Sequence, residues 1–106
     1  MSFYDSKRWE KTRAAILARD SYMCQFFKRY GKTKPANTVH HIFPRSEFPE
    51  HQWKRWNLIS LSQEAHGKMH DRNTGELTEA GQELLRRTAR ANGIEIPEKY
   101  IGGKKR

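Results

Sequence analysis

The chain has 106 residues, of which 35% are hydrophobic and 31% charged, with a formal charge of +9. This length suits one domain with a modest core, and the charge favours a polyanionic partner such as DNA over a neutral metabolite. The single cysteine, Cys24, excludes an intramolecular disulfide and a thiolate metal cluster, and no stretch is apolar enough for a secretion signal or a membrane span, so we expect a cytoplasmic protein.

The charge is unevenly distributed along the chain. Nine basic and three acidic residues fall in residues 1–37, and seven basic and two acidic residues fall in residues 86–106, whereas residues 38–85 hold five and seven. Basic flanks can neutralise phosphates while a mildly acidic centre does chemistry. Flanks that are simply solvated explain the same pattern, and the charge alone leaves both readings open.

The first predicted element is a basic N-terminal helix over residues 6–19. Ser6 can cap it, since a serine side chain accepts a hydrogen bond from the first turn. Apolar and small side chains recur on one face at three-to-four spacing, namely Trp9, Thr12 and Ile16. Residues 22–27 fit a short strand or a buried turn, and residues 28–37 form a basic loop.

Residues 38–43 predict a strand, because they are rich in β-branched and aromatic types and stop at a proline. Side chains alternate along a strand, so His40 and His41 must point to opposite faces. Residues 57–61 are the predicted returning strand of an antiparallel ribbon with a long connection. Adjacent histidines that face different ways suit two roles better than one.

A short helix is expected from Ser62 to about Asp71, with His66 and His70 one turn apart on the same face. A second, C-terminal helix is expected over residues 78–92, which Gly93 would end. The basic tail at residues 102–106 is expected to be mobile.

Three imidazoles can converge on one ion if the first strand packs against the short helix, namely those of His40, His66 and His70. Three neutral ligands leave positions for water and a phosphate oxygen, as in a catalytic site. The ion would be manganese, magnesium, nickel, cobalt or zinc, since affinity order alone does not select one.

His41, with its ordinary pKa near 6.5, is then free to deprotonate a water that attacks phosphorus. Asn57 can fix the loop of His41 through amide hydrogen bonds.

The ordered His40-His41, Asn57, His66 and His70 resembles the HNH endonucleases, and the surrounding sequence looks like the small single-domain HNH proteins that bacteriophages encode near their DNA-packaging genes. The resemblance implies one α+β domain over residues 1–106 with its motif core at 38–71. In that fold a two-stranded antiparallel ribbon and a metal-binding helix, the ββα-metal fold, are flanked here by the N-terminal and the C-terminal helix.

The resemblance also implies roles: His41 as general base, Asn57 as the orienting residue, and His40, His66 and His70 as metal ligands. It implies that the protein nicks or cleaves double-stranded DNA with low sequence specificity. A phage packaging context would make the terminase large subunit a partner and the host cytoplasm the location, and we expect a monomer. Many relatives hold a structural zinc in paired Cys-x-x-Cys knuckles, which this sequence lacks, so no structural zinc is expected.

Several basic residues are candidates for contact with DNA: Arg45, Lys68, Lys7, Arg8 and Lys11. Solvated charge is the simpler explanation for Arg45 and Lys68, and the charge pattern leaves both readings open for the three residues of the N-terminal helix. His51 has no partner at ligand spacing and is expected to be exposed. A non-catalytic DNA-binding module or packaging adapter with a structural metal site is the alternative. Such a closed site needs a fourth ligand, and only Cys24, His51 or an acid such as Asp71 could supply it.

Overall fold

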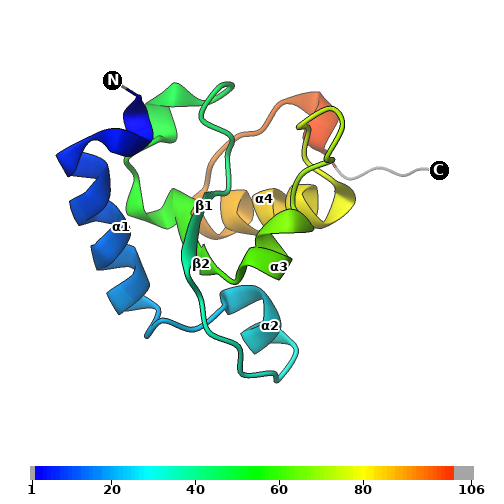
Figure 1. Ribbon diagram of the computed structural model, residues 1–106. Helices are drawn as coiled ribbons and strands as arrows, with labels where there is room; N and C mark the ends of the chain where they lie inside the picture. Colours follow the sequence, from blue (N-terminus) through cyan, green and yellow to red (C-terminus); the bar gives the residue numbers. More distant parts are fainter. Residues whose placement is uncertain (1, 102–106) are drawn as a thin grey trace.

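The computed structural model describes residues 2–101 and has the predicted α+β architecture. A two-stranded antiparallel sheet lies at its centre, with helices on either side (Figure 1). The helices are α1 (Lys7–Arg19), α2 (Gln25–Arg29), α3 (Gln63–Gly67) and α4 (Glu79–Asn92), and the strands are β1 (Thr38–His41) and β2 (Leu58–Leu61). Short 3-10 turns are η1 (Phe3–Asp5), η2 (Pro49–His51), η3 (Arg55–Asn57) and η4 (Glu98–Tyr100). The basic tail predicted at residues 102–106 lies outside the described residues.

Helix capping follows the sequence closely. The hydroxyl oxygens of Ser6, Ser62 and Thr78 each accept a hydrogen bond from a backbone N–H in the first turn of α1, α3 and α4. Gly93 follows α4 with a φ of 64°, a left-handed conformation that glycine adopts without steric cost. Among the described residues, no helix has both the length and the apolar character that crossing a membrane requires.

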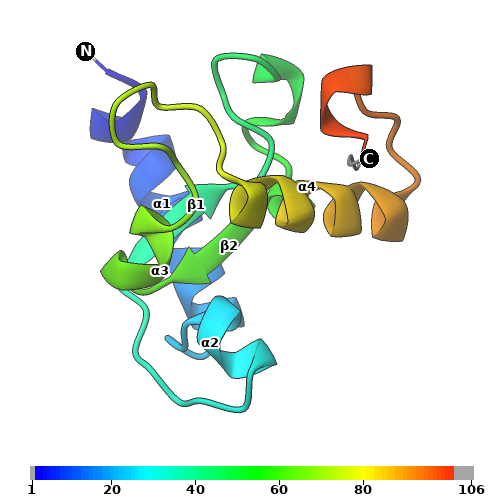
Figure 2. The same ribbon diagram turned by 90° about the vertical axis from the view of Figure 1, so that its right-hand side faces the viewer.

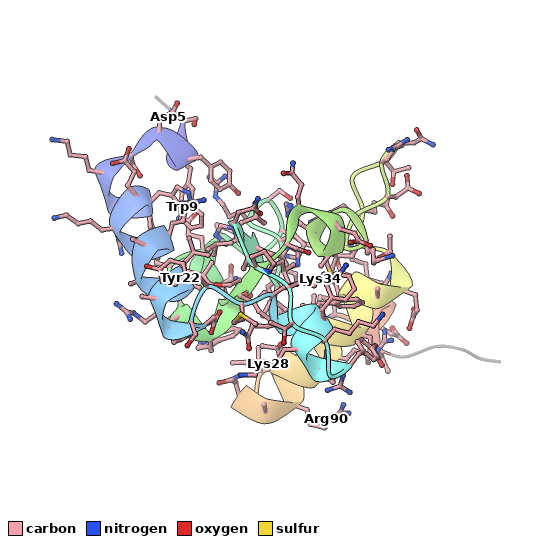
Figure 3. All side chains as sticks on the ribbon, turned by 60° about the horizontal axis from the view of Figure 1, so that its bottom comes forward. Asp5, Trp9, Tyr22, Lys28, Lys34 and Arg90 are labelled. Atoms are coloured by element: carbon pink, nitrogen blue, oxygen red, sulfur yellow. The ribbon has the colours of Figure 1, made fainter. Side chains whose placement is uncertain are left out.

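The two strands pair with Thr38 opposite Leu61 and His41 opposite Leu58. Helix α1 covers one side of the sheet, and α3 and α4 lie on the other (Figure 2). Side chains on the α1 side form a small cluster, in which Trp9 and Ile16 of α1 pack with Leu58 of β2. Figure 3 shows Trp9 directed from α1 toward the sheet. The larger core joins the sheet to α2, α3 and α4.

The end of α1 is fastened to the edge of β2 by Asp20. Its carboxylate pairs with Arg19 at 2.9 Å and accepts a hydrogen bond from the backbone N–H of Ser60 at 3.0 Å. Burial raises the pKa of Asp20, but these hydrogen bonds outweigh it and leave the pKa below its ordinary value. Arg19 also donates to the carbonyl oxygen of Leu58 at 2.7 Å, so α1 and β2 have a fixed relative position.

The predicted strands are shorter in the structure, since β1 ends at His41 and β2 begins at Leu58, and two other predicted elements differ more. Residues 22–27 form neither a strand nor a simple turn: Met23 makes an isolated bridge to Pro35, and α2 begins at Gln25 and buries Phe27. The short helix predicted to Asp71 ends at Gly67, because the chain then turns back on itself and His70 pairs with Leu77 in a β-bridge. His70 therefore lies beyond α3, not on its face.

Gly81 of α4 lies where the helix crosses the segment that carries His70. A Cβ at this position would come within 2.5 Å of the carbonyl oxygen of Met69 and 2.9 Å of Leu77 Cδ2. The carbonyl oxygen belongs to the backbone, so the helix itself would have to move. Side chains are tolerated at Gly67 of α3, where nothing lies within 4 Å.

We expect Gly81→Ala to lower the free energy of unfolding by about 1–3 kcal/mol, because it overpacks this crossing. Thermal unfolding would show this as a drop in Tm of roughly 4–8 °C per kcal/mol for a domain of this size. The matched control, Gly67→Ala, is expected to leave Tm unchanged or slightly raised, since alanine is the better helix former. Equal Tm values for the two variants would contradict the tight crossing.

Candidate metal centre and its cleft

Three histidine side chains meet on the α3 side of β1. They come from β1, from α3 and from the bridge after α3, and they are His40, His66 and His70. Their candidate ligand atoms all lie within 4.8 Å of one another, and their ring centroids are 5.2–5.8 Å apart. Three nitrogens this close can reach one ion at about 2.1 Å through small ring rotations. The convergence expected from the sequence is therefore observed.

The nitrogen Nε2 of His40 makes the strongest argument for a metal. His40 is 1% exposed, and its Nε2 is buried without a hydrogen-bond partner. A buried polar atom left unpaired costs roughly 1–3 kcal/mol, so it calls for an unseen partner. A divalent ion bound by this nitrogen is such a partner, because nitrogen donors of neutral imidazoles suit these ions.

The protonation of the cluster also suits metal binding. Burial, and then repulsion from the neighbouring histidines, lowers the pKa of His40 well below its ordinary value and lowers that of His66. Both rings are therefore neutral at neutral pH and keep a lone pair for an ion. Nδ1 of His70 lies 3.0 Å from the carbonyl oxygen of Gly75, which can only accept, so Nδ1 carries the hydrogen and Nε2 is free to bind.

His41 lies on the opposite face of β1 and is separated from the cluster. Its Nε2 lies 3.1 Å from the carbonyl oxygen of Gln52. Because that oxygen can only accept, Nε2 carries the hydrogen and Nδ1 keeps the lone pair. The ring of Trp9 stacks on His41 with centroids 5.4 Å apart, and Phe3 packs edge-on at 5.6 Å.

The expectation of an ordinary pKa for His41 is wrong. Burial lowers its pKa from 6.5 to about 4; the hydrogen bond to Gln52 raises it in part, and the nearby Arg45 lowers it further. The aromatic side chains of η1 and α1 cause the burial, and they are more than thirty residues away in the sequence. His41 is consequently neutral throughout the physiological range.

Asn57 is fully buried, and its amide makes three hydrogen bonds. The oxygen Oδ1 accepts from the N–H of Phe43 at 2.6 Å, and Nδ2 donates to the carbonyl oxygens of Phe43 at 3.2 Å and His51 at 3.1 Å. It lies in η3, one residue before β2 begins. The amide thus ties together the two ends of the loop that follows His41.

A cleft of about 590 Å³ is lined by both groups of histidines. It lies over β1, which runs between α1 and α3 in Figure 1. Its other lining residues come from η1, α1, β1, the loop after β1 and the turn before α4, namely Tyr4, Trp9, Arg13, Thr38, Val39, Pro44, Arg45, Ser46 and Gly75. Of the basic residues predicted to contact DNA, Arg45 lines the cleft, whereas the other four do not: Lys68, Lys7, Arg8 and Lys11.

Arg45 is held in place at the cleft. Its guanidinium carbon lies 3.9 Å from the ring centroid of Phe3, and its Nε donates to the side-chain oxygen of Gln52 at 3.1 Å. Gln52 therefore supports both His41, through its backbone, and Arg45, through its side chain. The sequence gives no signal for Gln52, because a backbone carbonyl can come from any residue.

His51 does not have the exposed position expected for it. Its side chain is 17% exposed and packs among the rings of Phe43, Phe48 and Trp56. The aromatic residues near it in the sequence could have indicated that His51 is packed inside the loop. His51 belongs to the packing of the loop and lies outside the group of three histidines.

A comparison with models of protein families found no match, and a comparison with curated proteins found none either. Among solved structures, the chain is similar to the HNH endonuclease of the deep-sea thermophilic bacteriophage GVE2, whose crystal structure was determined with a manganese ion. The two are 41% identical, with a TM-score of 0.59, over 60% of this chain and 70% of that one. The chain belongs to the HNH endonuclease family. The ββα-metal fold expected from the HNH motif is thereby confirmed.

We expect manganese to raise the Tm of the wild-type protein, because an ion that binds only the folded state stabilises it, by about 2.7 kcal/mol at a hundred times Kd. His66→Ala removes one of the three candidate ligand nitrogens and should abolish most of this rise in Tm. His51→Ala, which alters a histidine outside the cluster, should keep it. A full manganese shift in His66→Ala would show that the ion binds elsewhere.

Proposed function

We propose that the protein is a divalent-metal-dependent endonuclease that hydrolyses phosphodiester bonds of DNA. One observation carries the proposal: a cluster of three imidazoles and a separate fourth imidazole open into the same cleft. The manganese ion of the phage relative is consistent with this use of the cluster. The three-histidine set leaves coordination positions for substrate and water.

In this proposal His40, His66 and His70 hold the ion, which would supply stabilisation of negative charge on the phosphate and on the departing 3′ oxygen. The Nδ1 of His41 accepts a proton from the water that attacks phosphorus. Its low pKa ensures that the ring is neutral when the water arrives. The carbonyl oxygen of Gln52 holds Nε2–H and favours the imidazolium that forms, which offsets part of the basicity lost through burial.

Two further residues support the chemistry. Asn57 orients the His41 loop through its three hydrogen bonds, as the family pattern implies. Arg45 lines the cleft with a guanidinium that has unused donors. Such a group can make a bidentate contact with a phosphate. Lys7, Arg8 and Lys11 are exposed residues of α1 outside the cleft and would add contacts to the DNA backbone farther from the centre.

The short ribbon and helix offer few side chains for reading bases, which supports low sequence specificity. Either nicking or double-strand cleavage fits a single centre. A role in phage DNA packaging, with a terminase large subunit as partner, rests on the resemblance to phage HNH proteins and on the phage origin of the relative. A monomeric enzyme in the host cytoplasm completes the proposal.

A purely structural metal site is less well supported. Within residues 2–101 the group of potential ligands contains three histidines and no fourth member. The three candidates for a fourth ligand are engaged elsewhere. Cys24 is buried in the main core, His51 packs among aromatic rings, and Asp71 accepts hydrogen bonds from the turn at Asn73 and Thr74.

We expect His41→Ala to slow cleavage of supercoiled plasmid by about two to four orders of magnitude, because it removes the proton acceptor. The same variant should keep the manganese-induced rise in Tm, since His41 lies on the other face of β1. Arg90→Gln, at an exposed position of α4 outside the cleft, should cleave at close to the wild-type rate. Normal cleavage by His41→Ala would rule out this histidine as the base.

A further inference from the structure

We propose that Arg13 is a phosphate-binding residue that holds the cleaved strand at the end of the cleft opposite Arg45. This inference rests on the proposed function, because it names how the same cleft grips DNA. Arg13 has no role in the HNH motif and lies far from it in sequence. The structure nevertheless places it in the wall of the cleft that contains the three histidines and His41.

The position of Arg13 is fixed by a backbone contact. Its Nη2 donates to the carbonyl oxygen of Asn37 at 2.7 Å, and Asn37 is the residue directly before β1. Arg45 follows the other end of β1 by four residues and also lines the cleft. The two guanidiniums therefore lie toward opposite ends of β1, and His40 and His41 lie between them.

The charge of Arg13 is not neutralised where it lies. The lining of the cleft contains no carboxylate, and within residues 2–101 Arg13 forms no ion pair. A guanidinium has five N–H donors, of which the contact with Asn37 uses one. Arg19, on the same helix, differs in each respect, because it is paired with Asp20 and bound to two carbonyl oxygens.

The distance along β1 indicates which phosphate Arg13 would bind. Three extended steps separate Asn37 from His40, or roughly 10 Å at about 3.3 Å a step. We therefore place the phosphate bound by Arg13 next to the one at the metal centre. The geometry fits a flanking phosphate of the same strand, so Arg13 should affect binding of DNA and leave the chemical step unchanged.

The competing explanation is that Arg13 only ties α1 to β1 through Asn37. Salt dependence separates the two, because a lost phosphate contact reduces the number of counterions released and a lost structural tether does not. We would measure kcat and KM on a duplex DNA from about 50 to 300 mM salt for Arg13→Gln and Arg13→Lys. The control is Arg90→Gln, an exposed arginine on α4 far from Trp9 and the cleft (Figure 3).

For Arg13→Gln we expect KM to rise about tenfold at low salt, kcat to stay within about twofold, and the slope of log KM against log salt to fall by about 0.9. Arg13→Lys should keep the wild-type slope because it keeps the charge. Arg90→Gln should match the wild type throughout. An unchanged slope in Arg13→Gln would overturn the proposal and leave Arg13 as a tether.

A second measurement uses the unaltered protein and does not depend on a variant that folds. Duplex DNA should protect Arg13 from modification by phenylglyoxal, read by mass spectrometry, while Arg90 is modified equally with and without DNA. Equal modification of Arg13 in both conditions would contradict the proposal. If the wild-type protein cleaves DNA and Arg13 is unprotected, only the role of Arg13 fails; if it neither cleaves nor binds DNA, the proposed function itself fails.

Discussion

The hydrogen bonds of the Asn57 side chain hold together the parts of the site that are far apart in sequence. Its amide lies in the dry interior and joins Phe43, two residues after His41, to His51, the neighbour of Gln52. Losing it would leave the buried N–H and carbonyl of Phe43 without this partner, at roughly 1–3 kcal/mol each. Since Gln52 in turn holds His41 and Arg45, one side chain determines where both lie.

The two faces of β1 give its two histidines different environments. On the α3 side, burial and mutual repulsion leave His40 with an unpaired nitrogen that a cation can satisfy. On the α1 side, Trp9 and Phe3 desolvate His41 while a carbonyl fixes its tautomer. In the proposed mechanism, metal binding would therefore be linked to folding on one side of the sheet, and proton transfer would take place independently on the other.

Local rules predicted the parts of the structure that depend on neighbouring residues. Strand alternation placed His40 and His41 on opposite faces, and the capping serines and Thr78 started the helices where expected. Contacts between residues that are not sequence neighbours account for what was missed. The bridge from Leu77 takes His70 out of α3, and Trp9 lowers the pKa of His41 from across the fold. Gln52 acts through its backbone, which no side-chain pattern reveals.

Two neighbouring histidines on one strand also create a demand on folding accuracy. A shift of β1 by one residue against β2 would exchange the two faces, so that each side would still meet an imidazole, but the wrong one. Hydrophobic patterning alone discriminates weakly between such alternatives. The contact between Asn57 and the N–H of Phe43 spans the ribbon and therefore favours the observed register, whereas Asp20 fixes β2 to α1.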